Sequence, residues 1–185
     1  MLSLARDHLE TDRLVLRRLT EADAERMVVL ANFIEIARNL ATMPHPYGIE
    51  DAHAFIARTH GLKAGISLGI VEKQTGDLIG VAGRGPMEEG GPIDFGYWLG
   101  LDYWGKGYAS EAGSAVLTHA FCIGRVDEII TDCRIDNPGS RRVLDKLGFE
   151  SLGPAMRYSL GAGEETETEQ VRLGCDDWLA MKACA

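Results

Sequence analysis

The stretch from residue 105 to residue 109 combines residue types that can hold a phosphate group. Gly105 and Gly107 lie on either side of Lys106, and apolar or small residues then recur from Ala109 onward at the spacing of one helix face. A turn of this kind presents unpaired main-chain N–H groups and the positive end of a helix dipole at one place. The two glycines allow a bulky anion to come close to them. The sequence therefore predicts a phosphate cradle at this turn.

Two nucleotide-binding patterns are partly matched by the same stretch. The run from Gly100 to Lys106 has the GxxxxGK spacing of a P-loop, but Gly107 follows where serine or threonine would hold magnesium. The run from Gly105 to Ser110 has part of a dinucleotide fingerprint and lacks its third glycine. A nucleotide-binding protein that uses the near P-loop therefore stays an alternative.

A second informative run, from 136 to 149, has the features of a short helix with both ends marked. Asn137 can cap this helix, Pro138 suits its first turn, and Gly148 suits its end. Taken alone, Asn137 is a plain helix cap, and Ser140 is a serine in the first helical turn. The function of this run therefore depends on which residues of other elements lie next to it in the fold.

The elements that position these two runs are strands and helices. Residues 94–99 are aromatic and apolar and predict a mostly buried strand before the glycine turn, and residues 126–135 predict a strand before the second run. Gly96 suggests a bulge in the first of these strands. Further strands are predicted at 14–16, 66–72, 78–84, 150–160 and 168–174, and further helices at 20–31, 50–60 and from 109 to about 123.

Length and composition fit a single domain, with residues 1–8 as a tail and 9–180 as the domain. The chain has 185 residues, is 45% hydrophobic and carries a net charge of −9. An acidic chain without a basic stripe disfavours nucleic acid as a ligand and is compatible with a cationic amine or a basic peptide. No apolar run approaches the ~20 residues of a membrane span. The four cysteines lack zinc spacing, so we expect no metal, and we expect reduced thiols in a cytoplasmic protein.

The two runs together resemble the GNAT N-acetyltransferases, and in particular their RimJ/RimL-like branch. The family loop Arg/Gln-x-x-Gly-x-Gly/Ala is matched at Gly107 and Ala109, with Trp104 in place of the arginine or glutamine. The run from 137 to 149 matches Asn-x-x-Ser-x-x-x-x-x-Lys-Leu-Gly-Phe at every fixed position. The opening LxTxRLxLR, from 9 to 17, is also similar to that branch.

The resemblance implies an α/β (α+β) fold with one mixed, mainly antiparallel sheet and helices on both faces. Two neighbouring strands, 94–99 and 126–135, would splay apart and admit the pantetheine arm of coenzyme A. The activity it implies is acetyl transfer from acetyl-CoA to a primary amine, with Ser140 protonating the departing thiolate. The residues expected to bind the coenzyme are Trp98, Leu99, Gly105, Lys106, Gly107, Tyr108, Ala109 and Asn137.

The acceptor chemistry calls for a base, because an amine must be neutral to attack and an alkylamine titrates near pH ~10.4. Asp94, on the central strand, is the first candidate, followed by Glu35 or His45 acting through water. The tetrahedral intermediate also needs a donor for its oxyanion, and we expect a backbone N–H exposed by a bulge near Trp98 or Leu99. The side chains expected to bind the acceptor are Glu35, His45 and Tyr47.

Two functional classes stay open at this stage. One is an enzyme that acetylates a protein N-terminal amine, as RimJ/RimL-like proteins do on ribosomal proteins, or a small amine. The other is a catalytically silent module that binds acyl-CoA as a regulator, and the presence of Ser140 favours the enzyme. Family members are often dimers, so a homodimer is compatible with the resemblance.

Overall fold

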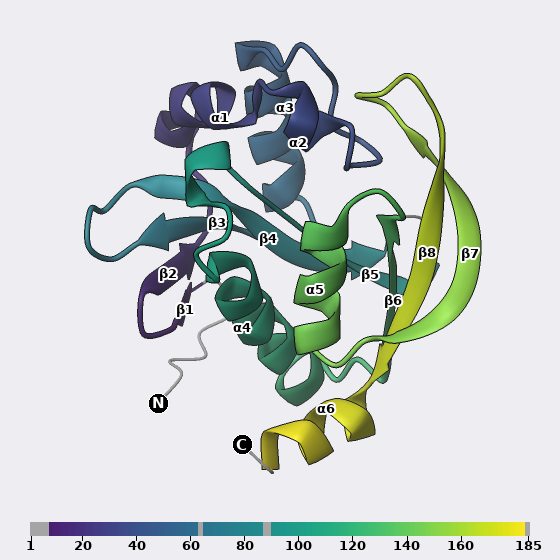
Figure 1. Ribbon diagram of the computed structural model, residues 1–185. Coiled ribbons are helices and arrows are strands. Elements are labelled where there is room, and N and C mark those ends of the chain that lie inside the picture. Colours follow the sequence, from purple (N-terminus) through teal and green to yellow (C-terminus); the bar gives the residue numbers. More distant parts are fainter. Residues whose placement is uncertain (1–7, 63–64, 87–89, 184–185) are drawn as a thin grey trace.

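The computed structural model describes residues 8–62, 65–86 and 90–183, which form eight strands in two antiparallel sheets (Figure 1). The first sheet has the order β1-β2-β3-β4-β5 and the second the order β6-β8-β7. The strands are β1 (His8–Glu10), β2 (Leu14–Arg17), β3 (Ile66–Glu72), β4 (Leu78–Pro86), β5 (Ile93–Leu99), β6 (Glu128–Arg134), β7 (Glu150–Ser159) and β8 (Glu164–Gly174).

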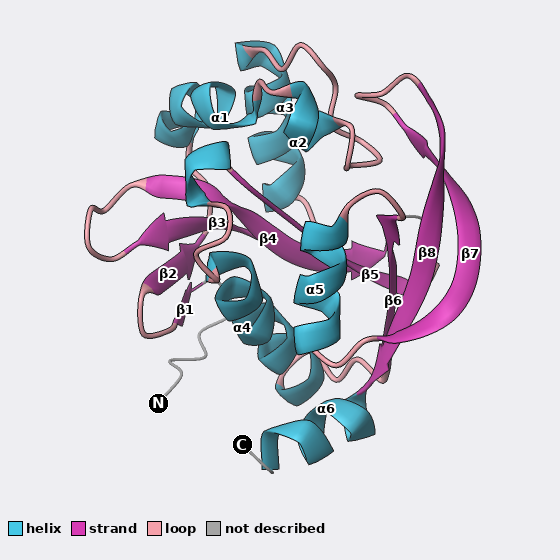
Figure 2. Ribbon diagram, in the orientation of Figure 1, coloured by secondary structure: helices cyan, strands magenta, loops and turns pink. Residues whose placement is uncertain are grey.

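Helices lie on both sides of the first sheet. In Figure 2, α1, α2 and α3 lie together at the top, while α4 and α5 cross in front of the strands. The α-helices are α1 (Ala24–Ala31), α2 (Ile34–Ala37), α3 (Ile49–His60), α4 (Tyr108–Cys122), α5 (Pro138–Lys146) and α6 (Cys175–Ala183). Two single turns of 3-10 helix, η1 (Glu21–Asp23) and η2 (Leu101–Tyr103), precede α1 and α4. No described helix combines the length and the apolar character that crossing a bilayer requires.

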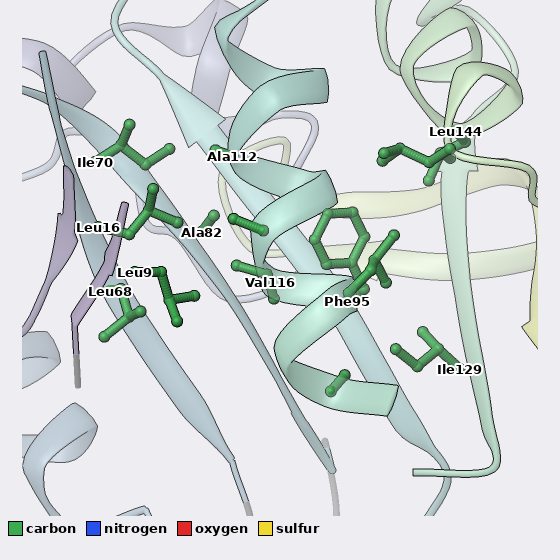
Figure 3. Packing of buried hydrophobic residues seen from close by; sticks show 14 of the residues in the cluster. Leu9, Leu16, Leu68, Ile70, Ala82, Phe95, Ala112, Val116, Ile129 and Leu144 are labelled. Carbon is green, nitrogen blue, oxygen red and sulfur yellow. The ribbon is translucent and has the colours of Figure 1, made fainter. Parts of the chain in front are cut away.

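Two hydrophobic cores form because side chains alternate between the faces of each strand. On β5, Phe95 and Leu99 belong to the core that contains Val116 of α4 (Figure 3). Trp98 points to the opposite face and belongs to the core that contains Met27 of α1 and residues of α2 and α3. The strand that leads into the glycine turn is therefore covered by helices on both faces.

The two sheets part between β5 and β6. These strands are neighbours, and the Thr131 side chain donates a hydrogen bond of 2.9 Å to the Phe95 carbonyl oxygen, but they belong to different hydrogen-bonded sheets. The predicted antiparallel α/β fold is confirmed. The ladder is divided into two sheets at the predicted splayed pair rather than continuing as one sheet, because β6 pairs with β8 and not with β5.

Most predicted elements agree with the structure to within a few residues. The strand predicted at 66–72 is β3, the helix predicted at 50–60 is α3, and the helix after the glycine turn begins one residue earlier than expected. The helix predicted at 20–31 is divided into η1 and α1. His8, which we expected in the tail, begins the unpredicted strand β1, and the rest of that predicted tail lies outside the described residues.

Candidate acetyl-donor site

A cavity of about 770 Å³ lies where the two sheets part. Its lining comes from α2 and the residues after it, the end of β5, the glycine turn with the start of α4, and one side of α5 from Pro138 to Lys146. Most of the residues that the sequence predicted for the donor site meet there, although the two runs are about thirty residues apart. They are Trp98, Leu99, Gly105, Gly107, Tyr108, Ala109, Asn137 and Ser140.

Both glycines of the glycine turn have positive φ angles. Gly105 has φ +73°, and Gly107, the N-cap of α4, has φ +83°. Both values lie in the left-handed region that glycine adopts without strain. The turn therefore directs the first amides of a 15-residue helix toward the cavity mouth, where a helix N-terminus attracts an anion.

Arg13 supports this turn from the start of β2, a contact that sequence reasoning missed. Its guanidinium donates a hydrogen bond of 3.0 Å to the Lys106 carbonyl oxygen and lies over the Tyr108 ring, 4.5 Å from the ring centroid. It also forms an ion pair of 2.7 Å with Glu111 in the first turn of α4. Burial alone would raise the pKa of Glu111, but hydrogen bonds from Thr11 and Arg13 outweigh it and lower that pKa.

The signal for this support was present in the opening LxTxRLxLR motif, whose threonine and first arginine are Thr11 and Arg13. Both side chains donate to the carboxylate of Glu111. Thr11 precedes Glu111 by 100 residues, so a motif near the start of the chain holds the helix that follows the glycine turn. The local pattern of the motif does not indicate so distant a partner.

Trp104 takes the place of the family's arginine or glutamine and makes a different contact. Its indole N–H donates a hydrogen bond of 2.8 Å to the Leu99 carbonyl oxygen, and its ring is half-exposed in the cavity lining. Trp104 therefore ties the glycine turn to the end of β5. Lys106 is not in the described lining, and its ammonium lies 5.5 Å from the centroid of the Tyr103 ring.

The end of β5 lacks the bulge that we expected to expose a backbone N–H. The pairing of β4 with β5 keeps one register from Gly80↔Leu99 to Pro86↔Ile93, so Gly96 makes no bulge. The Gly100 N–H donates to the Ile79 carbonyl oxygen of β4. Because successive amides of a strand point to opposite edges, the Leu99 N–H points away from β4, toward the gap between the sheets.

Ser140 is held by two hydrogen bonds in the first turn of α5. Its backbone N–H donates to the side-chain oxygen of Asn137 at 3.0 Å, the cap that the sequence predicted. Its hydroxyl lies 3.0 Å from the hydroxyl of Tyr97, which comes from β5 on the other side of the gap. Burial raises the pKa of Tyr97 to about 12, so this phenol is protonated at neutral pH. Tyr97 was not among the residues predicted from the sequence.

Next to α2, the cavity is lined by two charged residues, one in the helix and one just after it. Glu35 is exposed there, and Arg38 forms an ion pair of 2.5 Å with Asp136, just before α5. Asp136 also pairs with Arg134, and this hydrogen bond is the main cause of its lowered pKa. Of the three side chains that we expected to bind the acceptor, the structure brings Glu35 alone into the described lining.

His45, Tyr47 and Asp94 do not line the cavity in the described part of the chain. Tyr47 is 3% exposed in the core beneath α1 and α3, where burial raises its pKa to about 12. His45 lies on the exposed surface. Asp94 precedes Trp98 by four residues on one strand, a separation of about 13 Å. Its carboxylate accepts a hydrogen bond from the Phe95 N–H and lies 3.5 Å from Arg157.

Arg157 joins Asp94 to a second carboxylate that sequence reasoning missed. It forms an ion pair of 2.5 Å with Asp132, whose side chain is 9% exposed on β6. The pKa of Asp132 is raised to about 6. Burial is the main cause and the nearby charge of Asp94 adds to it, while Arg157 opposes both effects. This cluster joins β5, β6 and β7 outside the described cavity lining.

Residues 13–150 match a family model described as an acetyltransferase (GNAT) domain. The chain is 32% identical over 164 residues to the uncharacterized N-acetyltransferase YoaA of Bacillus subtilis, covering 86% of this chain and 92% of that protein. It is 26% identical over 178 residues to the ribosomal protein uS5-alanine N-acetyltransferase of Escherichia coli, covering 92% of each. Among solved structures, a GNAT-family acetyltransferase from Bacillus anthracis aligns with a TM-score of 0.79 at 21% identity, covering 91% of this chain and 99% of that one.

Proposed function

Because the chain belongs to the GNAT acetyltransferase family, we propose that it transfers the acetyl group of acetyl-CoA to the α-amine at the N-terminus of a protein or peptide. The observation that carries this proposal is the meeting of the glycine turn with Asn137 and Ser140 in one cavity of about 770 Å³. The glycine turn would hold the diphosphate of the donor, and Asn137 and Ser140 would lie beside its thioester.

Donor binding rests on main-chain groups. The amides from Gly105 through Ala109 supply hydrogen bonds to the diphosphate, and the dipole of α4 favours its negative charge. The pantetheine arm then extends into the gap between β5 and β6, along Asn137. Trp104 offers no cation, so this site depends on backbone donors more than the usual family loop does.

The reaction follows from the groups around the gap. The neutral amine attacks the thioester carbon, and negative charge develops on the carbonyl oxygen, where the Leu99 N–H donates a hydrogen bond. The tetrahedral intermediate collapses by breaking the C–S bond, with the electron pair staying on sulfur. The thiol has a pKa near ~8.5, and Ser140 supplies its proton. The proton that the amine loses passes to solvent.

An α-amine suits this cavity better than an alkylamine, because the described lining contains no histidine and two carboxylates. Of these, Asp136 is already paired with Arg134 and Arg38, and Glu35 is exposed. At pH 7.5, roughly a third of α-amines but only about 0.1% of alkylamines are neutral. An α-amine therefore needs little help from a base, and Glu35 acts by attracting the ammonium form. The name of the E. coli relative, a uS5-alanine acetyltransferase, agrees with this choice.

Release of free thiol from acetyl-CoA, measured over a panel of acceptors, tests the proposal. We expect turnover with peptides that carry a free N-terminus and none when that terminus is blocked. The pH profile of kcat/KM should level off above about pH 8 for an α-amine acceptor. Faster turnover of spermidine, with a rate that still rises near pH 10, would contradict the choice of acceptor. Thermal stabilisation by coenzyme A without thiol release from any acceptor would instead favour the silent acyl-CoA-binding module.

A further inference from the structure

The hydroxyl pair of Tyr97 and Ser140 spans the gap between β5 and α5. Their oxygen atoms are 3.0 Å apart, and both residues line the cavity. Each side chain is fixed from a second direction. The Tyr97 ring packs against Phe95, with 5.7 Å between ring centroids, and Ser140 is held through its backbone by Asn137.

The direction of this hydrogen bond decides where the serine proton can go. A serine hydroxyl carries one proton and two acceptor positions. If Ser140 donated to Tyr97, its proton would be directed at the phenol and away from the substrate. If Tyr97 donates, the Ser140 oxygen is satisfied as an acceptor and its own proton is available to the cavity. The Tyr97 phenol can donate because it keeps its proton at neutral pH.

We propose that Tyr97 is a positioning residue that donates its hydroxyl proton to the Ser140 oxygen and thereby directs the Ser140 proton toward the thioester sulfur. This inference rests on the proposed function and assigns a role that the motifs did not include. When the C–S bond breaks, sulfur keeps the electron pair and takes the Ser140 proton. Ser140 takes the Tyr97 proton in turn, and water returns a proton to Tyr97 to balance the one that the amine released to solvent.

The proposal predicts a loss in the chemical step rather than in donor binding. Tyr97→Phe removes one oxygen atom and leaves the ring in its packing against Phe95. We expect kcat to fall by roughly 10- to 100-fold, less than the ~100- to 10,000-fold contribution of a general acid, because Ser140 is still present. The KM for acetyl-CoA should change by less than about threefold. Tyr158→Phe removes the same atom from an exposed tyrosine on β7 and should leave both constants unchanged.

A double-mutant cycle with Ser140→Ala separates positioning from a purely structural role. If Tyr97 acts through Ser140, Tyr97→Phe should change kcat by less than about twofold once Ser140 is alanine. An equal loss in both backgrounds would overturn the inference, since Tyr97 would then act independently of Ser140. Full activity of Tyr97→Phe, or of Ser140→Ala, would overturn it as well.

The two proposals fail in different ways. If the wild-type protein releases no thiol with any acceptor, the proposed function fails and this inference fails with it. If the wild-type protein is active and Tyr97→Phe retains its kcat, only the inference fails. Unfolding temperatures of all five proteins are measured alongside the kinetics. We expect Tyr97→Phe to unfold within about 2 °C of wild type, since the packing of its ring is kept.

Discussion

Gly107 is the residue on which the proposed binding of the donor depends most directly. It begins α4 in the left-handed region, and its position lies in the cavity lining. Residues other than glycine rarely adopt this backbone conformation, and β-branched residues are the least compatible with it. A side chain at position 107 would therefore strain the backbone. It would also obstruct the approach of an anion to the main-chain amides.

Replacing Gly107 with valine should therefore lower the affinity for coenzyme A by at least about 100-fold, because the diphosphate loses its close approach to the amides. Isothermal titration calorimetry measures this affinity directly. Gly76→Val is the matched control, since Gly76 has φ +76° in the β3–β4 turn and open space around it. Equal affinities for the two variants would contradict the assignment of the glycine turn to the diphosphate.

Residue types and spacing predicted the polar positions that act locally. The Asn137 cap and the position of Ser140 in the first turn of the helix both follow from sequence neighbours. Tyr97 and Arg13 could not be found in that way. Their contacts are 43 and 98 residues distant along the chain, with Ser140 and Glu111 respectively, so the fold must be known before either partner can be named.

At the scale of elements, the link between β2 and α4 holds the glycine turn in place. Arg13 contacts the Lys106 carbonyl, the Tyr108 ring and the Glu111 carboxylate, all within the turn or the first turn of the helix. Exposed ion pairs contribute little to stability. The Arg13–Glu111 ion pair should therefore affect mainly the position of the glycine turn and not the stability of the protein.

Arg13→Ala should raise the KM for acetyl-CoA by roughly 3- to 10-fold and leave kcat within about twofold, because it loosens the diphosphate site and not the reacting groups. Steady-state kinetics at saturating acceptor measure both constants. Arg172→Ala is the control, since Arg172 forms comparable surface ion pairs with Glu128 and Glu150 on the second sheet. A fall in kcat with unchanged KM would contradict a role confined to the turn.

The contact between β4 and β5 sets the position of Leu99, whose N–H is the proposed oxyanion donor. Gly80 faces Leu99, and a Cβ atom at Gly80 would lie 2.2 Å from the Trp98 carbonyl oxygen. That oxygen belongs to the backbone, so a larger residue forces the strands apart. The sequence pattern located both strands. It could not reveal this close approach, because the approach depends on the register in which the two strands pair.

Gly80→Ala should destabilise the protein by roughly 1 to 3 kcal/mol, as overpacking in a well-filled interior does. Urea denaturation measures the change in the free energy of unfolding. Gly96→Ala is the matched control, because Gly96 is exposed in β5 and a Cβ atom there would meet nothing within 4 Å. The steric explanation would be wrong if both variants had the same stability.

At the scale of the whole molecule, the cluster of Asp94, Asp132 and Arg157 joins the two sheets. Asp132 lies on β6 and Asp94 on β5, and Arg157 of β7 contacts both carboxylates. The folded-state pKa of Asp132 is about 6, above its value in the unfolded chain. The folded state therefore binds a proton more tightly than the unfolded state, and ionisation of Asp132 opposes folding.

The free energy of unfolding should therefore fall as the pH rises through the pKa of Asp132. Between pH 5 and pH 7.5, the ionisation of Asp132 should lower the free energy of unfolding of the wild-type protein by roughly 1 to 1.5 kcal/mol. Asp132→Asn lacks this ionisation, so the stability of the variant relative to wild type should increase by that amount over the same range. Urea denaturation at several pH values checks it, with Asp176→Asn on the exposed start of α6 as the control. A constant difference between wild type and Asp132→Asn would contradict the raised pKa.

The fold as a whole was predicted in outline, since periodicity located most strands and helices and the family resemblance supplied their arrangement. The division into two sheets is a property of strand partners, and nothing local to 94–99 or 126–135 reveals which edge each strand uses. Asp132 illustrates the same limit. Its raised pKa arises from burial among residues of three strands, so no short sequence window contains its cause.

The separation of β5 from β6 has a consequence for the speed of donor association. Because β5 and β6 belong to different hydrogen-bonded sheets, the gap that we propose for the pantetheine arm is part of the fold itself. No hydrogen bonds of a β5–β6 ladder have to break when the thioester binds. The free energy of keeping these strands apart is therefore already part of the folded state. Such a preformed entrance loses little affinity to reorganisation and allows capture at rates limited by diffusion and orientation.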